Sequence, residues 1–182
     1  MKLFNTFVAV LFLILATQNI ALAGADAFTP GPQIKNFGEN AKVNQSKPVS
    51  KDAKFKVAFD VGKPAEPGKL NRNFNSLARF INMHIAAGVK PENIELALVV
   101  HGKAGLDLLH NRARKAKELT ENPNLPLLKA LMNNNTQVFL CGQTAAYYDI
   151  KNEDLYDGVQ MSLSAMTAHA LLQQNGYTVN PF

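Results

Sequence analysis

The amino-acid sequence predicts an α/β fold: a three-layer α/β/α sandwich with a mostly parallel sheet of about five strands. Two kinds of segment predict it. Short apolar runs of strand length alternate along the chain with longer segments whose apolar residues recur at helical spacing. Because a helix that connects two parallel strands lies on a face of their sheet, this alternation indicates a sheet covered by helices on both sides.

Several short runs are expected to be strands. The run 94–100 is nearly continuous in apolar residues, which is typical of a strand buried on both faces. Asp157-Gly158 predicts a turn before a short strand, and the last run is expected at an edge of the sheet. The expected strands are 55–60, 94–100, 137–141, 159–163 and 177–179.

The segments between these runs have the spacing of amphipathic helices. In the second of them, Leu106, Leu109 and Ala113 share one face. Gly88 and Gly176 follow the first and the last, at the position where a glycine commonly ends a helix. The expected helices are 70–85, 106–116, 125–132 and 165–175.

The first residues have the features of a secretory signal peptide. Lys2 supplies the positive charge, residues 7–16 are apolar, and Ala21-Leu22-Ala23 offers a small-x-small cleavage site. We therefore expect residues 1–23 to be a signal peptide that is removed near Gly24. The mature protein is expected in the periplasm, without a membrane anchor.

Residues 24–54 contain three prolines and isolated apolar residues without a sustained period. Such composition buries too little apolar surface to offset the entropy of ordering, so a flexible linker or arm is expected. Residues 55–182 are expected to form the folded α/β domain.

The composition excludes several kinds of protein. The formal net charge of +5 over 182 residues is too small for a dedicated nucleic-acid binder. A single cysteine forms neither an internal disulfide nor a multi-thiolate zinc site. Phosphate-binding loops, dinucleotide fingerprints and serine-hydrolase elbows are absent from the sequence, so no cofactor is expected. His84, His110 and His169 lack metal-ligand spacing, and no metal is expected.

A basic stretch lies on the second expected helix. It is most simply a solvated helix face, although it is also able to attract anionic thio-compounds or a partner protein. Its residues are Arg112, Arg114, Lys115 and Lys117.

Three reactive or polar residues stand at the ends of expected strands: Asp60, His101 and Cys141. In parallel sheets, functional groups gather beyond the carboxyl ends of the strands. We therefore take Cys141, His101 and Asp60 as the candidate catalytic residues.

Cys141 stands at a strand-to-helix junction, where unpaired N–H groups favour a thiolate and thereby a nucleophile. The alternative is a buried structural thiol, because a free cysteine packs as a small hydrophobe. A protonated His101 would favour the thiolate by its charge, and a neutral one would accept the thiol proton. Asp60 would orient His101 or cap a turn.

The sequence resembles the DsrE/DsrF-like family in three motifs. His101-Gly102-Lys103-Ala104 follows a strand, Asn122-Pro123-Asn124 precedes a leucine-rich helix, and 138–143 reads Val-Phe-Leu-Cys-Gly-Gln. The resemblance spans about residues 55–182. It implies an α/β/α fold that assembles into trimers or hexamers. In sulfur-trafficking members it also implies a cysteine that carries sulfur as a persulfide, and Cys141 matches that cysteine of an exported, Cys-Gly-Gln-bearing branch.

Two positions depart from the family's pattern. Asn134-Asn135 stand where a glycine often ends a helix, and asparagine tolerates the left-handed backbone needed there. Tyr156-Asp157 replace the usual Leu-Pro before Gly158, so a loop near the expected site differs from that of relatives.

The leading functional hypothesis is an exported sulfur-relay protein, a sulfurtransferase or sulfur carrier, that holds sulfane sulfur on Cys141. Gly102, Gly142 and Gln143 are the expected binding residues: Gly142 leaves room for a donor, and the amides after it stabilise charge. The expected partners are a sulfur donor and an acceptor thiol on a protein or small molecule. A homo-trimer or homo-hexamer is expected, with no nucleic acid and no membrane contact after signal cleavage.

Two rival hypotheses remain. One is a non-catalytic oligomeric module that binds a small ligand or a protein and has a structural Cys141. The other is a hydrolase that uses Cys141, His101 and Asp60, which requires neighbours in that order to lie within hydrogen-bond reach.

Overall fold

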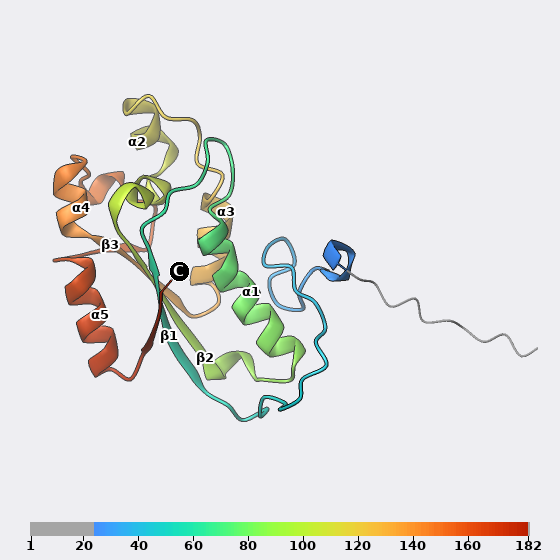
Figure 1. The fold of residues 1–182 in the computed structure, drawn as a ribbon. Coiled ribbons are helices and arrows are strands. Elements are labelled where there is room, and N and C mark those ends of the chain that lie inside the picture. The colour runs from blue at the N-terminus through green and yellow to red at the C-terminus, as the bar shows by residue number, and fades with distance from the viewer. Residues whose placement is uncertain (1–23, 182) are drawn as a thin grey trace, which may run out of the picture.

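The computed structural model describes residues 24–181, which form one five-stranded sheet with helices on both faces (Figure 1). Every pairing in the sheet is parallel, and the strand order is β4-β3-β2-β1-β5. The predicted α/β sandwich is thereby confirmed. The strands are β1 (Phe55–Val61), β2 (Ile94–Val100), β3 (Thr136–Cys141), β4 (Val159–Ser162) and β5 (Thr178–Pro181).

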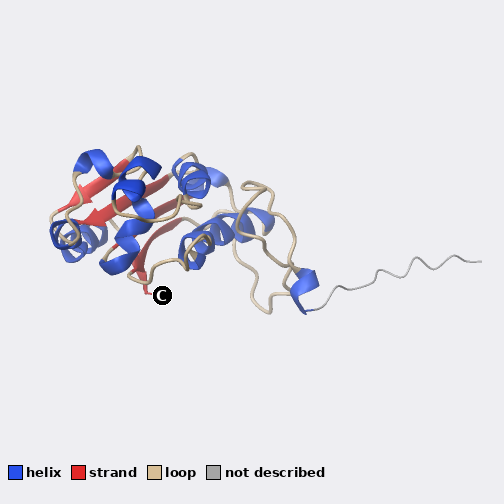
Figure 2. Ribbon diagram, turned by 90° about the horizontal axis from the view of Figure 1, so that it is seen from above, coloured by secondary structure: helices blue, strands red, loops and turns tan. Residues whose placement is uncertain are grey.

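The helices form the outer layers, as the view from above shows (Figure 2). Helices α1 (Arg72–Ala86) and α3 (Leu125–Met132) cover one face of the sheet, and α5 (Ala165–Gln174) covers the other. Helices α2 (Asn111–Ala116) and α4 (Gly142–Tyr147) lie toward the carboxyl ends of the strands. The short 3-10 helices are η1 (Gly24–Ala27), η2 (Pro91–Asn93), η3 (Gly102–Leu108) and η4 (Asn152–Asp154).

Strand side chains alternate between two cores, because successive residues of a strand point to opposite faces. In β2, Leu96 and Leu98 pack into the larger core with α1 and α3, while Ala97 and Val99 pack beneath α5. The same alternation directs Asp60 and Cys141 toward α5. Two of the predicted site residues therefore share one face of the sheet as well as one end.

The expected helix 106–116 is interrupted in the structure. It is divided into η3 and α2, and Leu109 between them is extended and pairs with Leu155. Asn122 explains the interruption, because its side-chain amide donates to the backbone carbonyls of Asp107 and Leu109. Those carbonyls consequently have a partner outside any helix.

Part of the segment 24–54, for which a flexible arm was expected, is packed on α1 (Figure 1). Asn82 of α1 is fully buried, and its amide group bonds the backbone N–H and C=O of Ile34 and the carbonyls of Phe37 and Gly38. Ile34 is only 4% exposed and belongs to the larger core. Residues 31–40 are thus part of the folded unit, whereas 42–48 are exposed.

The expected signal peptide, residues 1–23, lies outside the described residues. In residues 24–181, no helix has both the length and the apolar character required to cross a membrane.

Candidate active site

The three predicted catalytic residues lie at the carboxyl edge of the sheet. Asp60 is near the end of β1, His101 follows β2, and Cys141 ends β3. Because β2 lies between β1 and β3, the backbones of Asp60 and Cys141 are separated by two strand spacings, about 10 Å across the sheet. His101 stands between them.

Asp60 is bound by two histidines rather than one. Its Oδ2 lies 3.1 Å from Nε2 of His101, and its Oδ1 lies 2.8 Å from Nε2 of His169 on α5. Burial raises the pKa of Asp60, but the hydrogen bonds from His169 and His101 and their charge interactions together hold it below its ordinary value. The carboxylate is therefore ionised and accepts from both rings.

The imidazole of His101 lies over the end of β1. A side-chain carbon built on Gly62, the residue after that strand, would come within 2.6 Å of Cε1 of His101. Within residues 24–181, no hydrogen bond joins His101 to Cys141. The predicted Asp60–His101 pair is present, and the Cys141–His101 pair that a hydrolase needs is not.

Cys141 is surrounded by hydrogen-bond donors at the starts of α4 and α5. Burial raises the pKa of its thiol, but hydrogen bonds from the backbone of Thr144 and Ala165, the side chain of Thr144 and the backbone of Gln143 together lower it below its ordinary value. The residue is 7% exposed. The site thus favours a thiolate, although little of the sulfur-bearing residue is open to solvent.

The three predicted binding residues make contacts around the start of α4, and two of them also contact the loop between β4 and α5. The N–H of Gly102 donates to the Thr144 hydroxyl over 2.9 Å, and the side-chain amide of Gln143 donates to the Leu163 carbonyl over 3.2 Å. A side-chain carbon on Gly142 would lie 2.5 Å from the Ser162 carbonyl oxygen. Gly142 is therefore needed for the close approach of the loop between β4 and α5, which supplies the Ala165 amide.

Comparison with protein families gives one assignment. The family model of the DsrE/DsrF-like family matches residues 54–181. This chain belongs to the DsrE/DsrF-like family. Membership of this family suggests a role in sulfur relay. No curated protein matches the chain.

Solved structures similar to this DsrE/DsrF-like protein support the fold. YchN from E. coli is 22% identical with a TM-score of 0.51, and the match covers 70% of this chain and 99% of that one. MTH1491 from Methanobacterium thermoautotrophicum, described as a protein of unknown function, is 14% identical with a TM-score of 0.50 and the same coverage. Both similarities show the fold alone.

His169 is a site residue that sequence reasoning missed. Its place in a helical pattern gave it no role, because nothing in the sequence shows which strand lies beneath that helix. One signal was available: His169 is four residues after Ala165 and three before Leu172, so it shares a face with residues that pack on the sheet. That face carries it to Asp60.

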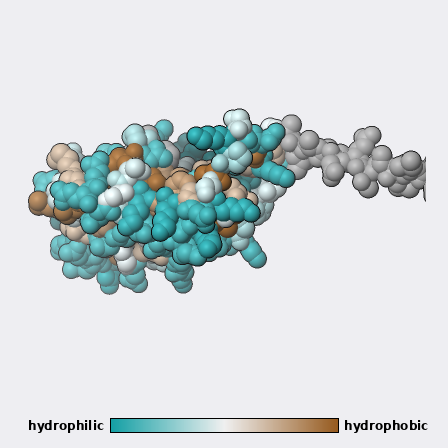
Figure 3. All heavy atoms as spheres, turned by 90° about the horizontal axis from the view of Figure 1, so that it is seen from below, coloured by the Kyte–Doolittle hydropathy of each residue, from teal (hydrophilic) through white to brown (hydrophobic). Residues whose placement is uncertain are grey.

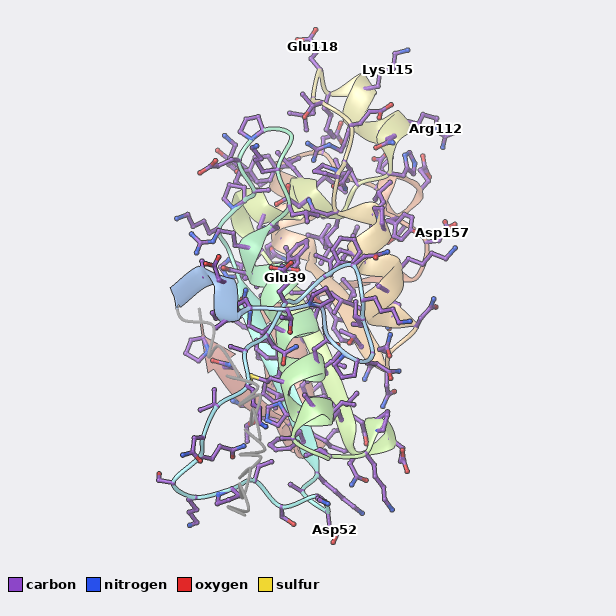
Figure 4. The ribbon with its side chains drawn as sticks, turned by 90° about the vertical axis from the view of Figure 1, so that its right-hand side faces the viewer. Glu39, Asp52, Arg112, Lys115, Glu118 and Asp157 are labelled. Carbon is purple, nitrogen blue, oxygen red and sulfur yellow. The ribbon has the colours of Figure 1, made fainter. Side chains whose placement is uncertain are left out.

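The basic stretch of this DsrE/DsrF-like protein is divided between surface and interior. Arg112 and Lys115 project from the molecule at α2 (Figure 4). Arg114 is buried, and its guanidinium donates to the carbonyls of Leu106 and Thr120. The charge of Arg114 therefore serves the fold rather than an anion at the surface.

A groove lies between α5 and the strands β3 and β4, with a volume of about 610 Å³. It is lined in its middle by Phe139, Met161 and Leu171, and one end reaches Ser162 and Leu163, beside the loop that covers Cys141. The side of the molecule that is seen from below is mostly hydrophilic, with hydrophobic atoms in small groups (Figure 3).

Three potential metal ligands meet at Asp60, His101 and His169, but both Nε2 atoms point at the carboxylate itself. In the part of the chain that the structure describes, no group of three or more histidine, cysteine, aspartate or glutamate side chains is arranged to hold a metal ion.

Proposed function

We propose that this protein carries sulfane sulfur as a persulfide on Cys141 and passes it to an acceptor thiol. The observation that supports the proposal is the set of N–H and O–H donors directed at the sulfur, which lowers the pKa of the thiol despite its burial. A thiolate is the form that attacks a sulfur atom. Membership of a family associated with sulfur relay agrees with this chemistry.

Loading is a single displacement at sulfur. The Cys141 thiolate attacks the outer sulfur of a donor persulfide, a new bond forms between Sγ and that sulfur, and the S–S bond of the donor breaks. The donor leaves as a thiolate with the electron pair. The amides of Gln143, Thr144 and Ala165 would stabilise negative charge on Sγ before attack and again after the sulfur has left.

The wider proposal is an exported, periplasmic carrier that works between a sulfur donor and an acceptor thiol as a homo-trimer or homo-hexamer. It includes removal of residues 1–23 and contacts of a donor with Gly102, Gly142 and Gln143. An unpaired thiol in an oxidising compartment needs protection from over-oxidation, and the low exposure of Cys141 would supply part of it.

Mass spectrometry tests the proposal directly. The mature chain, incubated with polysulfide and separated from the excess, should gain the mass of sulfur atoms. Cys141→Ser should gain none. No adduct on the wild type, or the same adduct on Cys141→Ser, would refute the proposal.

The second candidate is a non-catalytic module with a structural Cys141, favoured by the 7% exposure of that residue and by the groove of about 610 Å³ beside it. Alkylation by iodoacetamide at neutral pH distinguishes the two. If the protein is a sulfur carrier, Cys141 of the folded protein should be alkylated much faster than a buried, protonated thiol. If it is a binding module, Cys141 should be alkylated measurably only after unfolding.

A further inference from the structure

The carboxyl edge of the sheet contains a second group of reactive side chains that the sulfur-carrying step does not use. We propose that His101 is the general base for the acceptor thiol, held in the required tautomer by Asp60, which His169 fixes in place from α5. This inference rests on the proposed function and concerns its second half, the departure of sulfur from Cys141.

The hydrogen bonds determine the tautomer of both rings. An ionised carboxylate only accepts hydrogen bonds, so a nitrogen that faces it must carry the hydrogen. The Nε2 atoms of His101 and His169 face different oxygens of Asp60, at 3.1 and 2.8 Å. In the neutral form of each ring, the lone pair is therefore on Nδ1, and that atom is the one able to take a proton.

Only one of the two histidines is able to meet a substrate. Nδ1 of His169 is buried and has no hydrogen-bond partner, and the side chain is 16% exposed. The side chain of His101 is 38% exposed. His169 is consequently a positioning residue that holds the far oxygen of Asp60, and His101 presents the accessible base.

His101 also stands at the level of Cys141 in the sheet. Val100 pairs with Leu140 at the end of the parallel register; His101 directly follows β2, and Cys141 is the last residue of β3. Neighbouring strands are about 4.8 Å apart, so the backbones of His101 and Cys141 are about one strand spacing from each other, and the proposal places the acceptor thiol between them. Cys141 itself does not need this base, because backbone N–H groups already favour its thiolate.

The transfer step balances without an added oxidant or reductant. Nδ1 of His101 takes the proton of the acceptor thiol, and the resulting thiolate attacks the outer sulfur of the persulfide. A new S–S bond forms on the acceptor, the bond between Sγ of Cys141 and the outer sulfur breaks, and Sγ keeps the electron pair. The imidazolium then gives its proton to water.

The test separates loading from transfer and uses two acceptors. Wild type, His101→Ala, Asp60→Asn and His169→Gln are loaded with polysulfide, freed of excess donor, and mixed with either an alkyl thiol that is largely protonated at neutral pH or an aromatic thiol that is largely ionised there. A thiol that is already ionised needs no base. Loss of adduct is followed by mass spectrometry.

We expect all variants to load, because Cys141 and its donors are untouched. Transfer to the alkyl thiol should slow by about 100-fold or more in His101→Ala and Asp60→Asn, the range in which general bases act. His169→Gln should show a smaller loss with the same dependence on the acceptor. Transfer to the aromatic thiol should match the wild type in every variant, and added imidazole should restore the alkyl reaction of His101→Ala.

His84→Gln is the matched control, because His84 packs against Phe55 at the start of β1, the opposite end of the strand from Asp60. Equal slowing with both acceptors, or no slowing with either, would overturn this inference. Should Asp60→Asn fold poorly, the imidazole rescue of His101→Ala decides on its own. Absence of any adduct on the wild type would instead overturn the proposed function.

Discussion

At the scale of single residues, Thr144 makes two hydrogen bonds to the reactive sulfur and accepts a third from a neighbouring backbone N–H. Its backbone N–H and its hydroxyl both bond Cys141, and the same hydroxyl oxygen accepts the N–H of Gly102 over 2.9 Å. Because that oxygen already accepts one hydrogen bond, its own hydrogen is directed elsewhere, and the sulfur is the acceptor beside it. The ionisation of Cys141 therefore also depends on Gly102, which lies just beyond the neighbouring strand β2 and orients the Thr144 hydroxyl.

Replacing Thr144 by valine keeps the shape of the side chain and removes only the hydroxyl. The pKa of Cys141 should rise, because burial raises it and one of the hydrogen bonds that lower it has been removed. Alkylation by iodoacetamide at neutral pH should therefore slow several-fold. Thr144→Ser keeps the hydroxyl and should react like the wild type. The pH dependence of the alkylation rate measures the pKa directly. The same profile for valine and serine would contradict this role.

The candidate site was predictable in part, and the missing part has a physical reason. Asp60, His101 and Cys141 each lie at or next to the carboxyl end of a strand, so parallel topology alone places them at one edge. His169 is far along the chain and joins Asp60 only because α5 crosses the face toward which Asp60 points. Which helix covers which strand depends on the order of the strands in the sheet. No local sequence pattern predicts the order β4-β3-β2-β1-β5.

At the scale of elements, α1 contributes more than an amphipathic face. Its apolar residues were predictable from spacing, but Asn82 lies in the same buried stripe and reads in sequence as an interruption. The structure shows its partner: a loop of residues 33–38 whose N–H and C=O groups surround the amide. A segment without periodic apolar residues is thus ordered by side-chain to backbone hydrogen bonds, which periodicity does not report.

Asn82→Ala should destabilise the protein strongly. It leaves the buried carbonyls of Ile34 and Gly38 and the partly buried carbonyl of Phe37 without their side-chain partner, and each unsatisfied buried group costs free energy. We expect a loss of roughly 2–4 kcal/mol in the free energy of unfolding. Urea denaturation measures it, and limited proteolysis should show earlier cleavage within residues 24–54.

Asn44→Ala is the control for that experiment, because Asn44 belongs to the same segment and is exposed. It should change the unfolding free energy little. Equal stability of the two variants would show that the loop is held by Ile34 and not by the asparagine.

At the scale of the whole molecule, the sandwich followed from its apolar patterning because each layer has its own periodicity. Apolar residues alternate along a strand and recur every three to four residues along a helix, and both patterns are present in this chain from β1 to β5. The interruption of the expected helix 106–116 was not predictable in this way, because it is caused by Asn122, which lies in a later loop and donates hydrogen bonds to carbonyls inside that helix. Contacts of that kind join distant segments and leave no local period.

The stability of the whole molecule should fall in mild acid partly through His84. The imidazole packs between Phe55 and Phe80, with ring centroids 4.4 and 4.0 Å away, and its Nδ1 lies 2.7 Å from the Phe80 carbonyl oxygen. Burial lowers the pKa of His84 below its ordinary 6.5, although the bond to that carbonyl opposes the shift. The folded state therefore prefers the neutral ring.

The sign of the effect follows from proton binding. Below pH 6.5 the unfolded chain binds a proton at His84 that the folded chain resists, so the free energy of unfolding decreases as the pH falls through the interval between the two pKa values. Well above pH 6.5 both states are neutral there and the contribution is constant. His84→Phe keeps an aromatic ring between Phe55 and Phe80 and removes the titration. Urea denaturation across this interval should give a shallower decrease for the variant than for the wild type, because His101 and His169 are present in both and cancel in the comparison. Parallel curves would show that His84 is solvated enough to titrate alike in both states.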